Sequence, residues 1–254
     1  MSALVEIKDV CKIYNPGENE VRALDHVSLT IDEQEFVAII GHSGSGKSTL
    51  MNMLGCLDVP TSGEYWLHEQ DVSALSDDAL SDIRNREIGF IFQGFNLIPN
   101  LTALENVELP LIYRGVSKSV REELSVKALK KVGLEHRMDH KPSEMSGGQQ
   151  QRVAIARAIA QAPPVILADE PTGNLDSNST KEIMDILKGL HKEGRTVILI
   201  THDNEIAAQA KRVIKIRDGK IESDSGQIDP VGVRSTKQSA GSKVGDFASD
   251  ILTI

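Results

Sequence analysis

Residues 36–49 read F-V-A-I-I-G-H-S-G-S-G-K-S-T, and this stretch indicates the fold of the chain. Residues 36–40 are a continuous apolar run, which suits a central strand that is covered on both faces. Residues 41–49 fit the pattern G-x-x-x-x-G-K-S/T, and apolar side chains then recur at helical spacing up to residue 57. A buried strand, a glycine-rich loop and a helix are therefore predicted in direct succession.

The glycine-rich loop predicts a binding site for a chain of phosphates. Glycine lets successive backbone N–H groups turn toward phosphate oxygens, and the N-terminus of the following helix adds partial positive charge. We expect Lys47 to reach the β- and γ-phosphates of a nucleoside triphosphate and the Ser48 hydroxyl to coordinate Mg²⁺. The nucleotide-binding residues expected in the loop are Gly41, His42, Ser43, Gly44, Ser45, Gly46, Lys47, Ser48 and Thr49.

Strand and helix patterns that alternate along the chain predict a parallel α/β sheet. Residues 165–168 (V-I-L-A) and 197–200 (V-I-L-I) are apolar runs like residues 36–40, and helical patterns separate them. Residues 5–8 and 27–31 instead alternate between apolar and polar side chains, as half-buried antiparallel strands do. The fold class is therefore α/β, with an antiparallel part near the N-terminus.

The middle of the chain is expected to be helical. Residues from about 94 to 162 contain no convincing strand pattern, so we interpret them as a helical insertion in the α/β core. Within this range, apolar side chains recur every four residues between 119 and 132, which indicates an amphipathic helix. A second apolar stripe at 183–190 predicts another helix, in the region that ends at Gly194.

Residues 1–222 are expected to form a single domain, with its core at about 1–93 and 163–222. From about residue 223 the composition shifts to Ser, Gly, Asp and Lys, which is typical of disorder. Residues 223–254 are therefore expected to be a flexible tail, or else the last residues, F-A-S-D-I-L-T-I, dock as a short apolar segment.

Two adjacent carboxylates follow the second apolar run. Asp169 and Glu170 come directly after residues 165–168, which places them at the carboxyl edge of the sheet, where open α/β folds bind ligands. We expect Asp169 to hold Mg²⁺ through its water shell, and Glu170 to act as the general base on the attacking water. Adjacent acids can also cap a helix, but the phosphate loop favours the catalytic interpretation.

A second glycine-rich helix start lies at residues 145–152, which read M-S-G-G-Q-Q-Q-R. A single phosphate loop already surrounds one side of a triphosphate, so a second phosphate-facing helix is redundant for that nucleotide. It becomes useful if it faces the nucleotide of another copy. We therefore expect a head-to-tail homodimer that sandwiches two ATP molecules. The residues offered to the partner's ATP are Ser146, Gly147, Gly148 and Gln149.

Composition and charge limit the possible partners. The net charge of −9 disfavours a broad basic face for nucleic acid. The apolar runs fall far below the roughly 18 residues needed to cross a bilayer, and the N-terminus lacks the core of a signal peptide, so no direct membrane insertion is expected. Cys11 and Cys56 show no metal-ligand or disulfide spacing and are expected to be reduced, buried thiols.

Residues 3–222 strongly resemble the ATP-binding cassette (ABC) superfamily of transporter ATPases. The S-G-G-Q sequence at 146–149 resembles the family signature, with Met145 in place of the usual Leu, a change that conserves volume. The resemblance implies a P-loop NTPase core with an antiparallel β subdomain and an inserted α-helical subdomain. It also implies an ATPase that uses ATP and Mg²⁺.

The resemblance implies roles for four further residues. Gln93, in I-F-Q-G-F, matches the loop glutamine that senses Mg²⁺ and the attacking water, and that joins the core to the helical part. Asp176, in N-L-D, matches the loop that communicates across the dimer at the nucleotide. His202 matches the switch histidine that contacts the γ-phosphate, and Tyr14 matches the aromatic residue that stacks on adenine.

Two longer motifs narrow the resemblance. L-D-V-P-T-S-G-E at 57–64 and D-E-P-T-G-N-L-D at 169–176 are similar to the group of macrolide-efflux, lipoprotein-releasing, antimicrobial-peptide and cell-division ATPases. Because no fused membrane region is seen, a separate transmembrane permease subunit is expected, with this chain cytoplasmic and peripheral on the inner face of the cell membrane. The apolar stretch 90–101 is expected to line a groove for a cytoplasmic helix of that permease, unless these side chains are simply core.

Other functions are also consistent with these motifs. The chain is alternatively the ATPase subunit of an importer for amino acids or similar solutes, or a cell-division ATPase without solute transport. A noncatalytic nucleotide binder is disfavoured by intact Lys47, Glu170 and His202. A DNA-repair or chromosome-organising relative is disfavoured by the short insertion, which lacks heptads, and by the acidic charge.

Overall fold

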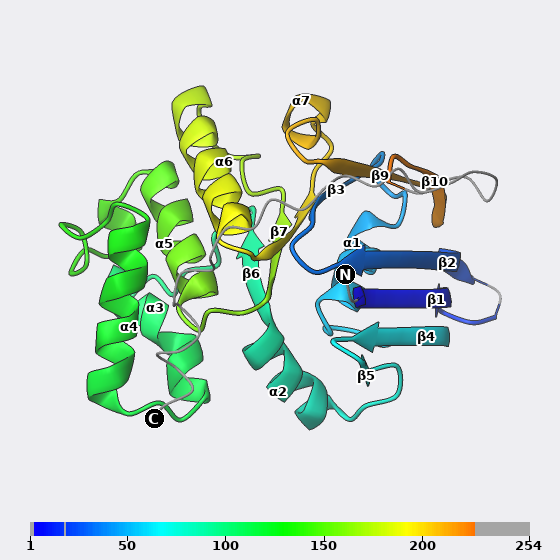
Figure 1. Ribbon diagram of the computed structural model, residues 1–254, viewed down its shortest axis with the longest axis horizontal. Helices are drawn as coiled ribbons and strands as arrows, with labels where there is room; N and C mark the ends of the chain where they lie inside the picture. Colours follow the sequence, from blue (N-terminus) through cyan, green and yellow to red (C-terminus); the bar gives the residue numbers. More distant parts are fainter. Residues whose placement is uncertain (1–2, 18, 227–254) are drawn as a thin grey trace, which may run out of the picture.

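The computed structural model describes residues 3–17 and 19–226. A central sheet with strand order β10-β9-β3-β8-β7-β6 divides this part of the molecule (Figure 1). Neighbouring strands from β9 to β6 are parallel, and β10 pairs antiparallel with β9. The strands are β3 (Phe36–Ile40), β6 (Ile88–Phe92), β7 (Val165–Asp169), β8 (Thr196–Ile200), β9 (Arg212–Arg217) and β10 (Lys220–Asp224).

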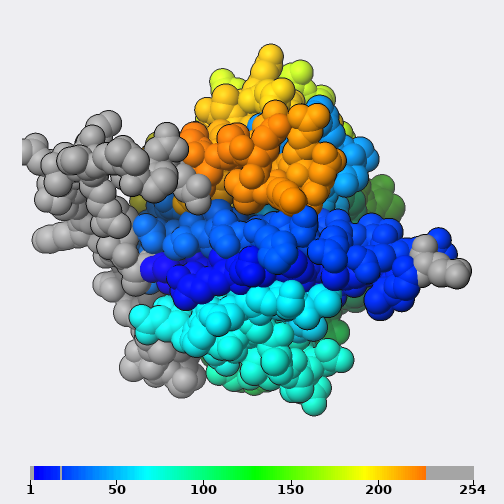
Figure 2. All heavy atoms as spheres, turned by 90° about the vertical axis from the view of Figure 1, so that its right-hand side faces the viewer, coloured from blue at the N-terminus to red at the C-terminus, as the bar shows by residue number. Residues whose placement is uncertain are grey.

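A smaller antiparallel sheet, with order β2-β1-β4-β5, packs on one side of the central sheet. Its strands are β1 (Ala3–Tyr14), β2 (Val21–Asp32), β4 (Ser62–Leu67) and β5 (Gln70–Asp71). Figure 2 shows β1 and β2 as blue bands between the cyan segment that contains β4 and the orange hairpin of β9 and β10. The β1–β2 ladder contains register shifts, one of them between Ile7 and Val10.

The helices occupy the region predicted to be helical and the connections of the central sheet. The range 94–162 contains α3 (Ala103–Tyr113), α4 (Lys118–Lys131), the short 3₁₀ helix η1 (Pro142–Glu144) and α5 (Gly147–Ile159), and it contains no strand. Helices α3, α4 and α5 pack on one another (Figure 1). The remaining helices are α1 (Lys47–Leu54), α2 (Asp77–Glu87), α6 (Ser177–Lys192) and α7 (Asn204–Ala207).

The central strands carry side chains into two separate cores. In β8, Ile198 and Ile200 belong to the core shared with the antiparallel sheet and α1, whereas Val197 and Leu199 belong to the core beneath α5 and α6. Successive side chains of a strand point to opposite faces, so a strand covered on both sides must be apolar throughout. This explains why β3, β7 and β8 are continuous apolar runs, and it confirms the predicted α/β class.

The last strand of the central sheet extends past the expected end of the domain. Strand β10 runs to Asp224, two residues beyond the expected boundary at 222, because it completes the edge of the central sheet. Residues 227–254, including the F-A-S-D-I-L-T-I segment, lie outside the described residues. Among the helices that are described, none is both long and apolar enough to cross a membrane.

Candidate nucleotide-binding site

The loop between β3 and α1 contains the glycines of the predicted phosphate-binding loop. Gly44 and Gly46 have φ angles of 76° and 102°, which side chains disfavour. A Cβ on Gly46 would lie 2.5 Å from the carbonyl oxygen of Ala23, whereas the space beside Gly44 is open. Lys47 folds over this loop, because its Nζ donates hydrogen bonds to the carbonyl oxygens of Gly41 at 2.6 Å and His42 at 2.8 Å.

Two adjoining hollows lie at the carboxyl edge of the central sheet. The first has a volume of about 560 Å³ and is lined by loop residues together with Asp169, Glu170 and His202. The second, of about 620 Å³, shares Glu170 and His202 with the first. The predicted loop residues that line one or both are Gly41, His42, Ser43, Gly44, Gly46, Lys47, Ser48 and Thr49. Ser45 is buried beneath them.

Asp169 and Glu170 line the same hollow as the loop, because β7 runs parallel to β3 with β8 between them and ends at the same edge of the sheet. Burial and the neighbouring Glu170 carboxylate raise the pKa of Asp169, whereas the Lys47 charge acts in the opposite direction. Glu170 has a φ of 43°, which is rare for a residue with a side chain. Its N–H donates to the carbonyl oxygen of Ile200 at 2.8 Å, and its Oε1 lies 2.7 Å from Nδ1 of His202.

Gln93 follows β6 and does not line either hollow. Its Nε2 donates to Oδ1 of Asn174 at 3.4 Å, and Nδ2 of Asn174 donates to the Gln93 carbonyl oxygen at 3.2 Å. A Cβ on Gly173 would lie 2.6 Å from Nε2 of Gln93, so a side chain there would displace the Gln93 amide. The structure therefore places Gln93 against the segment that leads to Asp176, next to the end of β7.

Tyr14 also lies outside the two hollows. Its hydroxyl donates to Oδ2 of Asp58 at 3.1 Å, and Nζ of Lys12 lies 5.2 Å from the centre of its ring. Its partner in the β1–β2 ladder is Val21, which lines the first hollow. Tyr14 is thus positioned one strand away from the edge of the hollow.

Residues 146–149 are the N-cap and first turn of α5, and they line neither hollow. The Ser146 hydroxyl accepts from the Gln149 N–H at 3.3 Å, and Gln149 Oε1 accepts from the Ser146 N–H at 3.0 Å, which is a capping box. Gly148 allows α5 to approach α6, because a Cβ there would lie 2.5 Å from Oγ of Ser179. Gly147 is the first residue of α5.

Asp176 caps α6 next to the start of α5. Its carboxylate accepts from the N–H groups of Asn178 and Ser179, both at 3.0 Å, and from Oγ of Ser179 at 2.8 Å. These hydrogen bonds hold the pKa of Asp176 below its ordinary value. Those from Ser179 have the larger effect, and the one from Asn178 has a smaller effect. Ser179 thus connects Asp176 with the glycine-rich start of α5.

Several residues that line the first hollow were missed by sequence reasoning. Arg22 and Ala23 come from β2, and Gly219 comes from the turn between β9 and β10. The N–H of Gly219 donates to the Ser45 carbonyl oxygen at 2.9 Å, which ties this turn to the phosphate loop. The Asp218–Gly219 pair marks a turn in the sequence, but nothing local indicates what that turn contacts.

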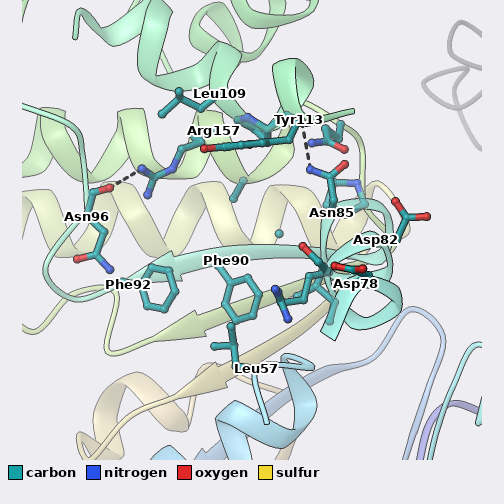
Figure 3. A pocket seen from close by; sticks show the side chains of 18 residues that line it. Leu57, Asp78, Asp82, Asn85, Phe90, Phe92, Asn96, Leu109, Tyr113 and Arg157 are labelled. Carbon is teal, nitrogen blue, oxygen red and sulfur yellow. Dashed lines mark hydrogen bonds between the residues drawn. The ribbon is translucent and has the colours of Figure 1, made fainter. Parts of the chain in front are cut away.

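A third hollow, of about 670 Å³, lies between the central sheet and the helical region (Figure 3). Phe90 and Phe92 of β6 stack at 5.4 Å beside Leu57, and Leu109 and Tyr113 of α3 lie across from them. We call this hollow the β6–α3 groove. Its lining residues also include Asn85, Asn96, Arg157, Gln161 and Pro163.

Of the stretch 90–101, which was expected to line a groove, Phe90, Phe92 and Asn96 line the β6–α3 groove. Phe95, Leu97 and Ile98 do not line the β6–α3 groove. Leu97 instead packs against the core beneath α5, because the chain turns at Phe95 and Asn96, which have φ angles of 60° and 50°. The alternative that these side chains are core therefore holds for Leu97.

Comparison with known proteins adds independent findings. A family model described as ABC transporter matches residues 24–173. The macrolide export ATP-binding/permease protein MacB of Hyphomonas neptunium is 58% identical over 223 residues, which are 88% of this chain and 35% of that protein. The chain thus spans about a third of the MacB relatives it matches. The uncharacterized ABC transporter ATP-binding protein YvrO of Bacillus subtilis is 52% identical over 87% of this chain and 96% of its own length.

Solved structures show the same architecture. The dimeric, post-hydrolysis structure of the ATP-binding cassette MJ0796, bound to ADP and Pi, has a TM-score of 0.80 and 50% sequence identity. It covers 87% of this chain and 97% of its own. The structure of cbiO1 from Clostridium perfringens, part of the complex cbiONQ, has a TM-score of 0.79 at 28% identity, over 88% of each chain.

Proposed function

Since this chain belongs to the ABC transporter family, we propose that it binds and hydrolyses Mg-ATP to power a separate membrane permease of the MacB or lipoprotein-release type. The cargo would be an antimicrobial peptide, a drug or a lipoprotein. One observation carries the proposal: Lys47, Asp169, Glu170 and His202 come from three separate parts of the sequence and line one hollow.

The residues present fit a magnesium triphosphate. Mg²⁺ prefers hard oxygen ligands, and the Ser48 hydroxyl and the Asp169 carboxylate supply them at the edge of the hollow. The open space at Gly44 leaves room for phosphate oxygens against the loop. Bound Mg²⁺ would neutralise charge on the phosphates, and Gln93 would join its ligands after leaving Asn174. Lys47 would exchange the carbonyl oxygens of its own loop for phosphate oxygens.

The general base is proposed to be Glu170. Its carboxylate is held by Nδ1 of His202 at 2.7 Å, which leaves Nε2 of His202 free to contact the γ-phosphate. Glu170 would take a proton from the attacking water as that water adds to the γ-phosphorus. Tyr14 is the last residue of β1, and its hydroxyl donates to Asp58. It would stack on the adenine ring.

The second half of each site is proposed to come from another copy of the chain. Ser146, Gly147, Gly148 and Gln149 lie at a helix N-terminus but line neither hollow of their own chain. Such a helix start attracts phosphate. In a head-to-tail homodimer these residues, with Asp176 beside them, would reach the partner's ATP. The dimeric state of the similar cassette MJ0796 supports this arrangement.

The permease would dock on the β6–α3 groove. Aromatic and aliphatic side chains from the central sheet and from α3 line this groove together, so its shape depends on how the helical region sits on the core. YvrO, matched over 96% of its length, is named as an ATP-binding protein, which supports a permease on a separate chain. The proposed location is therefore cytoplasmic and peripheral, at the inner face of the membrane.

Two measurements test this function. Purified chain should release phosphate from ATP only when Mg²⁺ is present, and Glu170→Gln should retain ATP but release phosphate at a rate lower by at least about 100-fold. Co-purification from membranes should yield a permease, and its identity decides among exporter, importer and cell-division roles. Magnesium-independent or absent phosphate release in the folded wild type would refute the ATPase assignment.

A further inference from the structure

Three side chains of types that can bind a metal lie close together on the antiparallel sheet, outside the residues that line the nucleotide hollows. Cys11 of β1 and Asp25 and His26 of β2 each present one possible ligand atom, and these three atoms lie within 4.8 Å of one another. Strands β1 and β2 are direct neighbours (blue in Figure 2), so strand pairing brings the side chains together. Spacing along the sequence does not reveal the cluster.

Irregular backbone geometry directs these residues toward one another. The β1–β2 register shifts on both sides of Val10, and Asp9 and His26 have φ angles of 52° and 53°. An extra residue in a strand turns the side chains that follow it. As a result, the N–H of His26 donates to Sγ of Cys11 at 3.3 Å, although 15 positions separate the two residues.

The imidazole of His26 is oriented as in a metal site. Its Nδ1 lies 2.7 Å from Oδ1 of Asp9, and its Nε2 faces Oδ1 of Asp25 at 3.9 Å. A carboxylate on one ring nitrogen fixes the tautomer and frees the other nitrogen for a metal. Ligand atoms on one tetrahedral Zn²⁺ lie about 3.5 Å apart, given bond lengths of roughly 2.0 to 2.3 Å. Small side-chain rotations therefore suffice.

The competing interpretation is that nearby cations simply neutralise Asp25. Its Oδ2 lies 2.9 Å from Nζ of Lys220, and its Oδ1 lies 3.5 Å from Nη1 of Arg22. Lys220 contacts Oδ2, whereas the oxygen paired with Nε2 of His26 is Oδ1. The side chain of Arg22 is 51% exposed and can move into solvent, which leaves Oδ1 accessible to an ion.

We propose that Cys11, Asp25 and His26 bind a divalent metal ion of the zinc type, with Asp9 orienting His26 and a water completing four ligands. Thiolate, imidazole and carboxylate together suit Zn²⁺ and do not suit Mg²⁺. Binding releases the Cys11 thiol proton, so affinity falls as the solution becomes more acidic. The site joins β1 to β2. It is also connected to the phosphate loop, because the N–H of Asp25 donates to the carbonyl oxygen of Gly219, and the N–H of Gly219 donates to the carbonyl oxygen of Ser45.

Titration of metal-free full-length chain with Co²⁺, without nucleotide, tests the site directly. Wild type should develop a near-ultraviolet thiolate-to-cobalt band and tetrahedral visible bands, and one equivalent of Zn²⁺ should remove both. Cys11→Ser should lose the thiolate band. Asp9→Asn should keep it with affinity weaker by roughly 10- to 100-fold, and His26→Ala should bind more weakly still.

His68→Ala is the matched control, because His68 is an exposed histidine whose Nδ1 lies 3.2 Å from a carboxylate oxygen of Glu87. It should keep the band and the wild-type affinity. If Cys11→Ser does not fold, as judged by circular dichroism, His26→Ala decides alone, since its side chain is 62% exposed. A folded wild type without the band, a band that survives in Cys11→Ser, or unchanged affinity in His26→Ala would overturn the proposal.

Discussion

At the scale of single residues, Lys47 shows how a functional charge is held ready. Its ammonium group is fixed by the carbonyl oxygens of Gly41 and His42 in the glycine-rich loop. Lys47→Ala should lower ATP turnover by roughly 100- to 1,000-fold, because a charge positioned on developing phosphate charge is lost. Phosphate release at saturating ATP measures this effect. Lys8→Ala, at an exposed lysine of β1, should leave turnover unchanged.

A second residue-scale prediction concerns Asp169, whose pKa is raised mainly by burial. The folded protein therefore binds this proton more tightly than the unfolded chain does. The resulting stabilisation is present at acidic pH and is lost as the pH rises through the raised pKa. In metal-free buffer, Asp169→Asn should raise the melting temperature at neutral pH, and the gain should shrink at acidic pH. Calorimetry at several pH values would contradict this if the two proteins melt alike throughout.

At the scale of elements, the close packing of α5 on α6 depends on the glycine at position 148. In Gly148→Ala the new Cβ would lie 2.5 Å from Oγ and 2.9 Å from Cβ of Ser179. The variant should lose about 1–3 kcal/mol of unfolding free energy through overpacking. Denaturant melts measure the loss, and adding Ser179→Gly should recover part of it. Gly189→Ala on α6, where no atom lies within 4 Å of the added carbon, should instead be neutral or stabilising.

Element by element, the sequence predicted what local patterns encode. The runs at 36–40, 165–168 and 197–200 became β3, β7 and β8, because burial on both faces demands apolar residues throughout. Residues brought in by long-range pairing were missed. Gly219 reaches the phosphate loop from the β9–β10 turn, and Cys11 meets His26 through a strand irregularity. Neither spacing nor residue type reveals such contacts.

At the scale of the whole molecule, a complete site is proposed to need two copies. Glu170→Gln, which would bind ATP without consuming it, should accumulate as a dimer in Mg-ATP. Sedimentation velocity should show twice the monomer mass with nucleotide and a monomer without it. Adding Ser146→Arg should restore the monomer, because a large cation would occupy the space expected for the partner's γ-phosphate. A Glu170→Gln protein that stays monomeric in saturating Mg-ATP would count against the shared site.

Strands β3, β7 and β8 are covered by side chains on both faces. Each contributes side chains to both cores, so their amides become accessible to deuterium only when the two cores come apart together. They should exchange slowest in the chain and at similar rates. Conformational changes during turnover must then leave these strands intact and occur in the loops that follow them.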